Sequence, residues 1–406
     1  MRLRAHVPRW PTRYLLAAVA CLVPLLPAGC GPSPGPSGTR RILEPGPAVC
    51  SGGPRRPSGT LRRRVAATGA TGNAVHVASD DVWVVESGSN TVSQYDPATG
   101  RYRSNFVDLG NGRNPFDLAV DEAADRLFIT NFLADSVAVA DADTGEVLRE
   151  VSSEALDNPQ GIAVAGDHVY VTSVQLQGSD YGPGSIAVFD RDPLRLSGTL
   201  EAKWKNPQYA RRIETPDGPR VAVVDSGAIE IDGGRARSAS SGGLELWRPD
   251  GRAARSSRET FSLDGSSSGA AGTPGRPIPL PNAPRLYVPS GTSPVLFTFD
   301  LRTKTWTAGA SDPIEVYDAE GNALLHAAVD PRGIVYVSAF NRDALYLIDS
   351  RCGRRLAGPI DLGKSPDLLE GAHSIATTAT DGRTRAYFLM TRSHVLGRTT
   401  FDYGGS

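Results

Sequence analysis

The sequence predicts an all-β fold, namely a seven-bladed β-propeller of four-stranded antiparallel blades, closed by an N-terminal strand. Three observations lead to this prediction. An apolar run with an aromatic residue at its second position recurs along the chain. A further apolar run, usually ending in Asp, follows it in most copies, and a run containing small residues precedes it. The copies are spaced by about 42 to 65 residues, which is typical of one propeller blade per repeat.

The first of these runs predicts the second strand of each blade. Its copies are VWVVE (82–86), LFITN (127–131), VYVTS (169–173), VAVVD (221–225), LYVPS (286–290), VYVSA (335–339) and AYFLM (386–390). Six of the seven copies carry Trp, Phe or Tyr at the second position, and Ala222 is the exception. We expect these aromatic side chains to pack in the core between blades rather than to stack on a ligand.

The next run predicts the third strand. Its copies are TVSQYD (91–96), SVAVAD (136–141), SIAVFD (185–190), GLELWR (243–248), VLFTFD (295–300) and ALYLID (344–349). Side chains alternate across a strand, so the apolar residue at the second position faces the same way in every copy. The terminal Asp precedes a Gly-ended turn in DPATG, DADTG and DSRCG, which predicts that its side chain caps the turn.

The run upstream of each aromatic predicts the inner strand. Its copies are GNAVHVAS (72–79), NPFDLAVD (114–121), NPQGIAVA (158–165), ALLHAAVD (323–330) and GAHSIATT (371–378). Small residues such as Ala119 and Ala163 suit strands that crowd around an axis. A fourth, more polar run, for example EVLREV (146–151), predicts an outer strand that faces water.

Closure of the ring follows from the two ends of the repeat region. The last repeat stops after HVLGRTTF (394–401) and lacks an outer strand. The segment TLRRRVAAT (60–68) precedes the first repeat and belongs to none. We expect this segment to supply the missing strand, because pairing the two ends removes an open sheet edge. The propeller is therefore predicted to span residues 59–406.

Residues 1–29 predict a signal peptide. Four Arg precede a short apolar stretch, residues 14–26, which is too short to remain in a bilayer as a permanent anchor. The sequence LLPAGC (25–30) resembles a bacterial lipobox, which implies cleavage before Cys30 and acylation of its thiol. The alternative is an ordinary secretory signal followed by an incidental cysteine.

Residues 30–58 are rich in Pro, Gly and Ser and predict a flexible tether between the lipid and the propeller. The expected location is the bacterial cell envelope, with the membrane contacted through the lipid anchor. Gly31 is not an acidic retention residue, so we expect the outer membrane.

The mature chain carries 39 Lys and Arg against 44 Asp and Glu, a net charge of −5. No basic run is long enough to follow a phosphate backbone, so we expect no nucleic-acid partner, and we expect a monomer. Cys50 and Cys352 remain after Cys21 leaves with the signal and Cys30 takes the lipid. An even pair in an oxidising compartment predicts a disulfide that locks the closure, with two free buried thiols as the alternative.

Three stretches resemble known propeller repeats. LFITNFLADSVAVADADTGEVLREV (127–151) and VWVVESGSNTVSQYDPATGR (82–101) resemble the YVTN-type repeat, and NPQGIAVAGDHVYVTS (158–173) is similar to the NHL type. The resemblance extends over roughly residues 60–403 and implies a propeller fold. It leaves function open, because such propellers occur as surface and periplasmic binding proteins, and related ones as lactonases and lyases.

In a propeller, the start of each inner strand and the end of each second strand lie on one face, around the mouth of the central channel. The candidate ligand-binding residues predicted there are His76, Glu86, Asp117, Asn131, Asp225, His326 and His373. Histidines and carboxylates together bind transition metals or perform acid–base chemistry. The alternative is that they are polar residues lining a water-filled channel. The sequence indicates no particular metal or cofactor.

The functional expectation is a non-catalytic, lipid-anchored module that binds a protein, a glycan or a small molecule. The alternative is a metal-dependent hydrolase or lactonase, or a lyase, with its site at the channel mouth. The resemblance implies carboxylate and amide metal ligands, which Glu86, Asn131 and Asp225 supply, whereas the equivalent residues in other repeats depart from such a set. A lyase of the streptogramin type implies a His beside an acid, such as His326 with Glu86 or Asp117. No HExxH motif is present.

Overall fold

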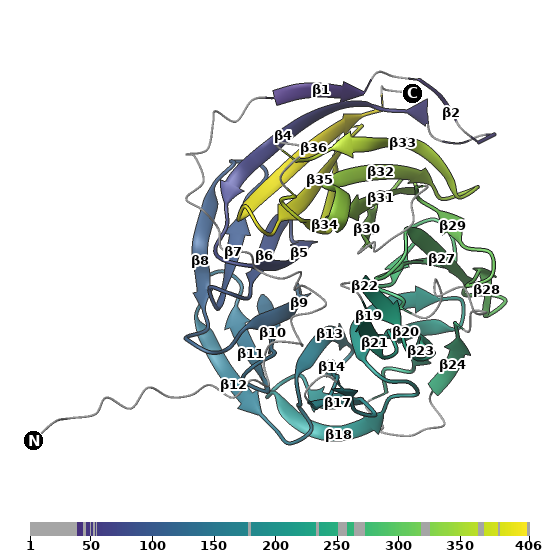
Figure 1. Ribbon diagram of the computed structural model, residues 1–406. Coiled ribbons are helices and arrows are strands. Elements are labelled where there is room, and N and C mark those ends of the chain that lie inside the picture. Colours follow the sequence, from purple (N-terminus) through teal and green to yellow (C-terminus); the bar gives the residue numbers. More distant parts are fainter. Residues whose placement is uncertain are drawn as a thin grey trace, which may run out of the picture.

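The chain folds as a ring of seven four-stranded antiparallel sheets around a central axis (Figure 1), which confirms the predicted fold class. The computed structural model describes residues 39–43, 46–48, 50–51, 53, 55–177, 180–232, 235–250, 258–263, 273–317, 325–363, 369–380 and 382–403. The predicted signal peptide and Cys30 lie outside these residues. Among them the helical content is one 3-10 turn, Phe340–Arg342, and no helix long and apolar enough to cross a membrane is found.

Each blade begins at the axis and ends at the outer wall. Blade 1 contains β5 (Gly72–Ala78), β6 (Asp81–Glu86), β7 (Thr91–Tyr95) and β8 (Tyr102–Asp108). Blade 2 contains β9 (Pro115–Asp121), β10 (Arg126–Asn131), β11 (Ser136–Asp141) and β12 (Val147–Ser152). Blade 3 contains β13 (Pro159–Ala165), β14 (His168–Ser173), β17 (Ser185–Asp190) and β18 (Arg195–Glu201). The hairpin β15 (Leu176–Gln177) and β16 (Asp180–Tyr181) is inserted in blade 3.

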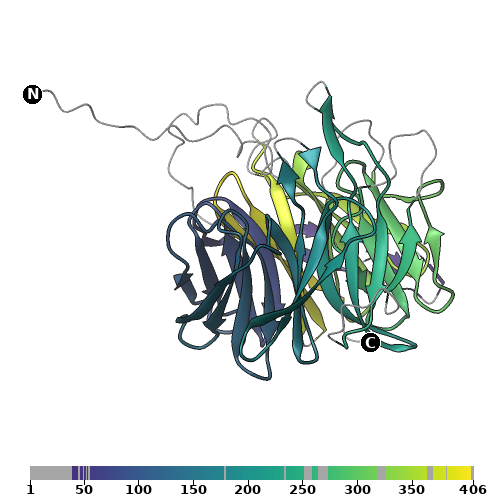
Figure 2. The same ribbon diagram turned by 90° about the horizontal axis from the view of Figure 1, so that it is seen from below.

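The second half of the ring is less regular. Blade 4 contains β19 (Pro207–Thr215), β20 (Gly218–Asp225), β23 (Gly243–Trp247) and β24 (Arg258–Ser262). Its inserted hairpin, β21 (Ile229–Asp232) and β22 (Arg235–Ser238), stands out from one face of the ring (Figure 2). Blade 5 contains β25 (Ile278–Pro279), β26 (Arg285–Pro289), β27 (Val295–Asp300), β28 (Thr305–Ala308) and the additional β29 (Ile314–Glu315). Blade 6 contains β30 (Leu325–Val329), β31 (Ile334–Ala339), β32 (Ala344–Asp349) and β33 (Arg354–Asp361).

Blade 7 joins the two ends of the chain. Its inner three strands are β34 (Ala372–Thr380), β35 (Arg383–Met390) and β36 (Val395–Asp402), and β4 (Ser58–Ala67) pairs antiparallel with β36. β1 (Thr39–Leu43) adds a fifth strand outside β4, and β2 (Gly46–Ala48) pairs with β3 (Arg55–Arg56). Part of the segment that we expected to be a flexible tether is therefore strand, because its backbone finds hydrogen-bond partners at the edge of blade 7.

The hydrophobic core lies between neighbouring blades, where the predicted aromatic column is buried. The residues of this column are Trp83, Phe128, Tyr170, Tyr287, Tyr336 and Tyr387, all at most 2% exposed. Tyr387 of blade 7 packs on Tyr95 of blade 1, with ring centroids 5.9 Å apart. These rings fill space between sheets and are not available to stack on a ligand.

The predicted Asp-capped turns follow the third strands. Oδ1 of Asp96 accepts a hydrogen bond from the Ala98 amide at 2.7 Å, and Oδ1 of Asp141 accepts one from the Asp143 amide at 3.0 Å. Asp300 caps the turn of blade 5 in the same way. A side-chain acceptor for the turn amides explains why Asp recurs at this position.

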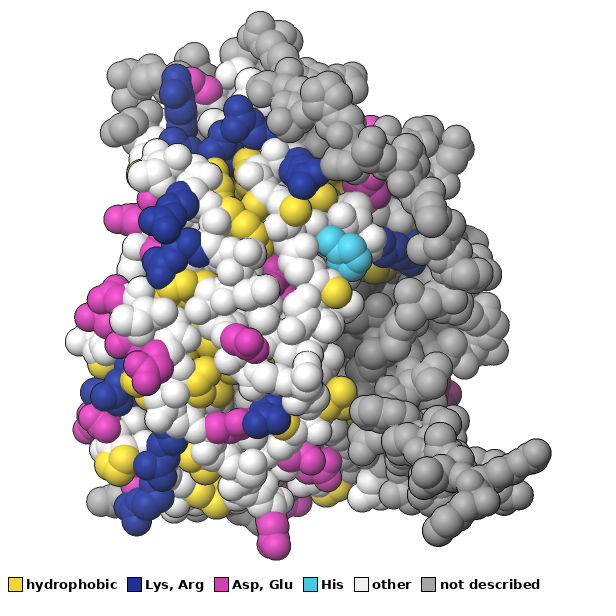
Figure 3. Space-filling model, turned by 90° about the vertical axis from the view of Figure 1, so that its left-hand side faces the viewer, with side chains coloured by type: hydrophobic (Ala, Val, Ile, Leu, Met, Phe, Trp, Pro, Cys, Tyr) yellow, Lys and Arg dark blue, Asp and Glu magenta, His cyan; other side chains and the backbone are white. Residues whose placement is uncertain are grey.

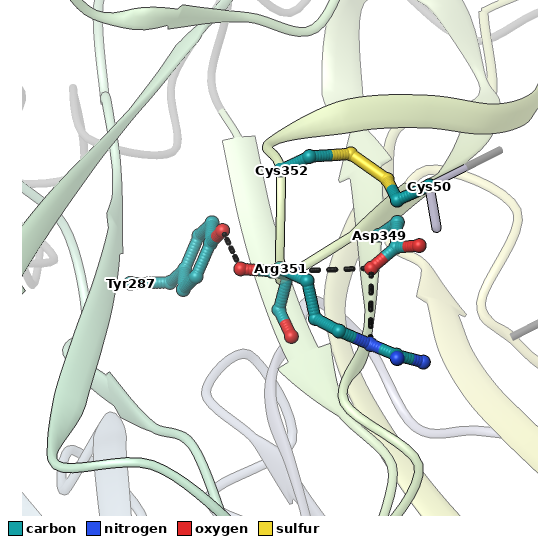
Figure 4. Close-up of a disulfide and its surroundings, with 6 residues drawn as sticks. Cys50, Tyr287, Asp349, Arg351 and Cys352 are labelled. Atoms are coloured by element: carbon teal, nitrogen blue, oxygen red, sulfur yellow. Dashed lines mark hydrogen bonds and ion pairs between the residues drawn. A yellow bond between two sulfur atoms is a disulfide. The ribbon is translucent and has the colours of Figure 1, made fainter. Parts of the chain in front are cut away.

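The predicted disulfide joins Cys50 to Cys352, with Cα atoms 6.4 Å apart (Figure 4). It links the segment that precedes β4 to the turn between β32 and β33. Beside it, the hydroxyl of Tyr287 donates a hydrogen bond to the Ser350 carbonyl at 2.9 Å, which ties blade 5 to the same turn. The cross-link therefore attaches the N-terminal strand of blade 7 to blade 6.

The outer wall carries charges of both signs. On the side seen in Figure 3, acidic and basic side chains are interspersed, and hydrophobic side chains form only small separate patches. Polar outer strands explain this surface, since β12 has five exposed residues in its six, VLREVS. Charged groups also line a cavity on the axis.

Candidate functional site

A cavity of about 380 Å³ lies on the propeller axis. Residues from the inner strands or inner edges of all seven blades line it, and most of them are Ala, Val, Ile or Leu. Its charged and titratable lining residues are His76, Asp117, Arg211, Arg212 and Arg276. A mostly apolar cavity with a few polar side chains on one part of its wall is typical of small-molecule sites.

Asp117 lies at the centre of a polar cluster in this wall. Nε2 of His76 is 2.8 Å from Oδ1 of Asp117, and Nη2 of Arg276 donates to the same oxygen at 2.6 Å. The Leu118 amide is a third donor to Oδ1, at 2.9 Å. Nη1 of Arg276 lies 3.3 Å from Nε2 and 3.5 Å from Nδ1 of His76, so the guanidinium covers the imidazole. Residues from blades 1, 2 and 5 thus meet at one carboxylate.

The charges of this cluster determine its protonation. Burial opposes ionisation of Asp117, but Arg276 and His76 outweigh that effect and lower the pKa of the carboxyl below its ordinary value. Burial, together with Arg276, lowers the pKa of His76 despite the hydrogen bond to Asp117. At neutral pH we therefore assign a carboxylate to Asp117 and a neutral imidazole to His76. Nε2–H then donates to Asp117, and Nδ1 is the acceptor nitrogen.

Arg211 is the second cation of the cavity. Burial, and then repulsion from Arg276, lower its pKa to about 10, while Asp117 opposes the shift. Its side chain is solvent-accessible, yet it lines the cavity, so we place its accessible surface inside the channel. Arg211 pairs across strands with Ala222, the exception in the aromatic column. The small side chain of Ala222 therefore lies opposite the large side chain of Arg211. Among the described residues, no hydrogen bond or ion pair of the Arg211 side chain is found.

His326 and His373 lie beside the cluster, at the starts of β30 and β34. Their ring centroids are 4.1 Å apart at an interplanar angle of 62°. Burial, the neighbouring His373 and Arg276 lower the pKa of His326 well below its ordinary value. Burial lowers the pKa of His373 to about 4, although a hydrogen bond with the Asn73 backbone opposes the shift. Both rings are neutral at pH 7, and neither lines the cavity.

The strand register shows that His76 and Asp117 do not occupy equivalent positions in their blades. His76 pairs with the aromatic Trp83, whereas in blade 2 the residue opposite the aromatic is Ala119. His76 is therefore two residues further along its strand than Asp117. The two side chains meet because they belong to adjacent blades, a relationship that repeat alignment alone does not give.

The predicted residues at the ends of the second strands do not join the cluster. Glu86 is buried and accepts four hydrogen bonds. Their donors are the Gly69 amide at 2.7 Å, Thr91 Oγ1 at 2.7 Å, Ser93 Oγ at 2.9 Å and the Tyr102 hydroxyl at 2.8 Å. Nδ2 of Asn131 donates to Ser136 Oγ at 3.1 Å and to Glu150 Oε1 at 3.3 Å. These side chains thus bond to outer strands of their own blades, away from the axis.

Asp225 has a similar partner in Glu245 on the third strand of its blade. Both are fully buried, and Oδ1 of Asp225 receives no hydrogen bond from a described donor. Burial and the Glu245 charge raise the pKa of Asp225 well above its ordinary value. Arg258 Nη1 donates to Glu245 at 3.2 Å. We therefore place a shared proton on Asp225, which donates to the Glu245 carboxylate.

These arrangements do not fit a metal ion shared by Glu86, Asn131 and Asp225, because each is held by partners in its own blade. Among the described residues, the group of potential ligands close enough to hold a metal is Cys50, Asp349 and Cys352. Its two sulfur atoms form the disulfide. We derive no reaction step through a metal from these residues.

Sequence reasoning missed Arg211 and Arg276. A signal for Arg211 was present, because Ala222 breaks the aromatic column directly opposite it. Arg276 precedes a two-residue inner strand, β25, and the repeat pattern is too short there to align. Its position is set by Ile278, which pairs with the aromatic Tyr287.

No protein-family model matches the chain, and no curated protein matches it in sequence. Among solved structures, a streptogramin B lyase aligns with a TM-score of 0.59 and 14% identity, over 85% of this chain and 98% of that one. The hydrazine synthase of Kuenenia stuttgartiensis aligns with a TM-score of 0.57 and 14% identity, over 81% of this chain and 95% of that one. At this identity the likeness shows the β-propeller fold alone.

Proposed function

We propose that the chain is an exported, lipid-anchored propeller that binds a small ligand in its axial cavity without transforming it. The observation that carries the proposal is the cavity itself, which is about 380 Å³ and has the cluster of His76, Asp117 and Arg276 in an otherwise mostly apolar wall. Hydrogen bonds hold these side chains in place before any ligand arrives. Such preorganisation favours binding, because little side-chain entropy is then lost on association.

The contacts of His76 support a non-catalytic role. A general base needs a ring nitrogen within reach of the substrate proton. Nε2 of His76 donates to Asp117, and Nη1 of Arg276 lies 3.5 Å from Nδ1. Nε2 is therefore occupied by Asp117, and burial together with the charge of Arg276 over the ring lowers the pKa of His76, which makes Nδ1 a weak base.

Export and anchoring rest on the leader and on the disulfide. Four Arg before an apolar stretch, followed by LLPAGC, support cleavage before Cys30 and acylation there. A bond between Cys50 and Cys352 is consistent with an oxidising compartment. Metabolic labelling with a palmitate analogue tests the anchor. The wild-type chain is expected to incorporate label and Cys30→Ser to incorporate none, whereas label retained by Cys30→Ser contradicts it.

Ligand binding is tested by filling the cavity. Ala119 and Ala328 line it from blades 2 and 6, so Ala119→Phe and Ala328→Phe each place a ring inside it. Ala67→Phe, on the exposed outer strand β4, is the matched control. In a fragment screen by ligand-observed NMR, we expect the two cavity variants to lose hits that the control retains. Hits that survive both cavity variants, or a screen without hits, contradict the proposal.

A lyase or hydrolase is the second candidate, and the hydrogen bond between His76 and Asp117 favours it. A carboxylate that orients an imidazole is a common arrangement for a general base. The test is turnover of a panel of lactones and streptogramin-type antibiotics by the purified protein, with metal analysis of the same sample. Turnover that disappears in His76→Ala favours the enzyme, and no turnover favours the binding module.

A further inference from the structure

We propose that the axial cavity is a carboxylate site, in which Arg211, beside Arg276, binds the carboxylate of a small, singly charged organic ligand. The inference rests on the proposed binding function and specifies the ligand class. It follows from the balance of charge in the cavity wall, the unused donors of Arg211 and the apolar character of the remaining wall.

The groups that line the cavity leave one positive charge without a negative partner. Arg211 and Arg276 are cations, and Asp117 is the one carboxylate among the described lining residues. His76 is neutral at pH 7, because burial and Arg276 lower its pKa. Arg212 is paired with Glu214 at 2.7 Å and needs no further partner. A net positive charge on the wall of a channel attracts an anion that balances it.

The available donors point to Arg211. Arg276 already uses Nη2 for Asp117 and directs Nη1 at His76. The side chain of Arg211 makes no hydrogen bond or ion pair with a described group, so its planar fork is open to a carboxylate. Arg276 also repels Arg211 and contributes to its lowered pKa. An anion between the two guanidinium groups would remove that repulsion.

The rest of the wall selects an organic ligand over an inorganic ion. Alanines at the aromatic-facing positions of four inner strands line the cavity, namely Ala119, Ala163, Ala328 and Ala376. A volume of about 380 Å³ lies at the lower end of the range for small-molecule pockets. A carboxylate with a hydrocarbon body fits both parts of this site, whereas phosphate would leave the apolar wall unused.

The test uses matched pairs that differ in charge but hardly in shape, namely benzoate with benzamide and hexanoate with hexanamide, and inorganic phosphate as a third probe. Affinities are measured by calorimetry at pH 7 on the full mature chain. We expect each carboxylate to bind at least about ten-fold more tightly than its amide, which corresponds to about 1.4 kcal/mol. Phosphate is expected to bind more weakly than either carboxylate.

Three variants locate the effect. Arg211→Gln is expected to lose about ten-fold or more in carboxylate affinity, and Arg212→Gln is expected to leave it unchanged. Asp117→Asn removes a competing acceptor and is expected to tighten carboxylate binding in protein that remains folded. Arg211→Gln removes an unpaired cation, so we also expect its ligand-free melting temperature to equal or exceed that of the wild type.

The outcomes separate this inference from the proposed function. Equal binding of amides and carboxylates, or carboxylate binding unchanged by Arg211→Gln, overturns the carboxylate site. If the amides bind and Ala328→Phe abolishes that binding, the axial binding function stands without the carboxylate site. Phosphate binding without carboxylate binding also overturns the ligand class. If neither the fragment screen nor the matched probes give binding, both proposals fail.

Discussion

The imidazoles of His326 and His373 stand edge to face, with centroids 4.1 Å apart, although 47 positions separate them in the sequence. They come from the inner strands of adjacent blades, and burial, with a smaller effect of the positive charge of Arg276, lowers the pKa of both. Two imidazoles in contact beside a cation resist protonation. This relationship makes the stability of the propeller depend on pH.

The first prediction concerns acid stability. The pKa of His373 is about 4 in the folded chain against 6.5 for an ordinary His, so the unfolded chain takes up a proton first. The free energy of unfolding therefore falls as pH drops from about 6.5 to 4, by about 3 kcal/mol for this group. Urea denaturation at pH 7 and pH 4 measures this fall. We expect the free energy of unfolding to fall by about 3 kcal/mol less in His373→Gln than in the wild type.

The matched control is His394→Gln, because the His394 side chain lies in an exposed turn. It is expected to keep the wild-type pH dependence. If the His373 variant also keeps it, burial does not hold this imidazole neutral and the assignment is wrong.

A second prediction tests the carboxylate at the centre of the axial cluster. Asp117→Asn removes the acidic partner of Arg276 and a negative charge near Arg211, so we expect the free energy of unfolding at pH 7 to fall by about 3 kcal/mol. Asp143→Asn, in an exposed turn, is expected to change it by less than about 0.5 kcal/mol. Urea denaturation of the two variants makes the comparison. Similar values for both would mean that the cluster contributes little to stability.

The third prediction concerns Asp225 and Glu245, for which stability is expected to fall as pH rises, in contrast to His373. Burial raises the pKa of Asp225, so the folded chain holds a proton that the unfolded chain releases above its ordinary pKa. The free energy of unfolding therefore falls as pH rises through that range. Asp225→Asn keeps a hydrogen-bond donor to Glu245 without titrating. We expect it to raise the free energy of unfolding at pH 8 by about 1 to 2 kcal/mol.

Urea denaturation at pH 5 and pH 8 checks this expectation. The gain from Asp225→Asn is expected to be larger at pH 8 than at pH 5. Asp225→Ala removes the donor to Glu245 and serves as the comparison, since it also leaves the Trp204 amide without its acceptor. If Asp225→Asn lowers the free energy of unfolding at pH 8, the assignment of the shared proton to Asp225 is wrong.

The fourth prediction concerns the disulfide. Cys50 and Cys352 are separated by 302 positions, and their bond fastens the N-terminal strand of blade 7 to blade 6. Reduction, or the double variant Cys50→Ser with Cys352→Ser, is expected to lower the free energy of unfolding by about 2 to 5 kcal/mol. Calorimetry with and without reductant measures it. The double variant itself is the control and is expected to be insensitive to reductant.

Much of the fold was predictable because the determinants of a blade are local. Alternation of apolar residues defines the strands, the aromatic at the second position marks the core, and Asp96 or Asp141 caps the following turn. Strand register was less predictable. His76 pairs with the aromatic Trp83, whereas the residue opposite Phe128 in blade 2 is Ala119, so His76 and Asp117 do not occupy equivalent positions.

The site was predictable only in part. The structure brings together His76, Asp117, His326 and His373 near Arg276, whereas Glu86, Asn131 and Asp225 bond within their own blades. The end of a strand tells which face of the ring a residue occupies. It does not tell whether the side chain turns inward or outward, because that depends on acceptors such as Glu150 on another strand.

By itself the sequence determined the repeat and the all-β fold, because these follow from local periodicity, and the small number of cysteines predicted the pairing of Cys50 with Cys352 that the structure contains. Only the tertiary structure decided which charges meet on the axis. Arg276 contacts His76 from 200 positions away and Asp117 from 159. Contacts of this kind arise when ring closure brings distant blades to one point, and no local pattern encodes them.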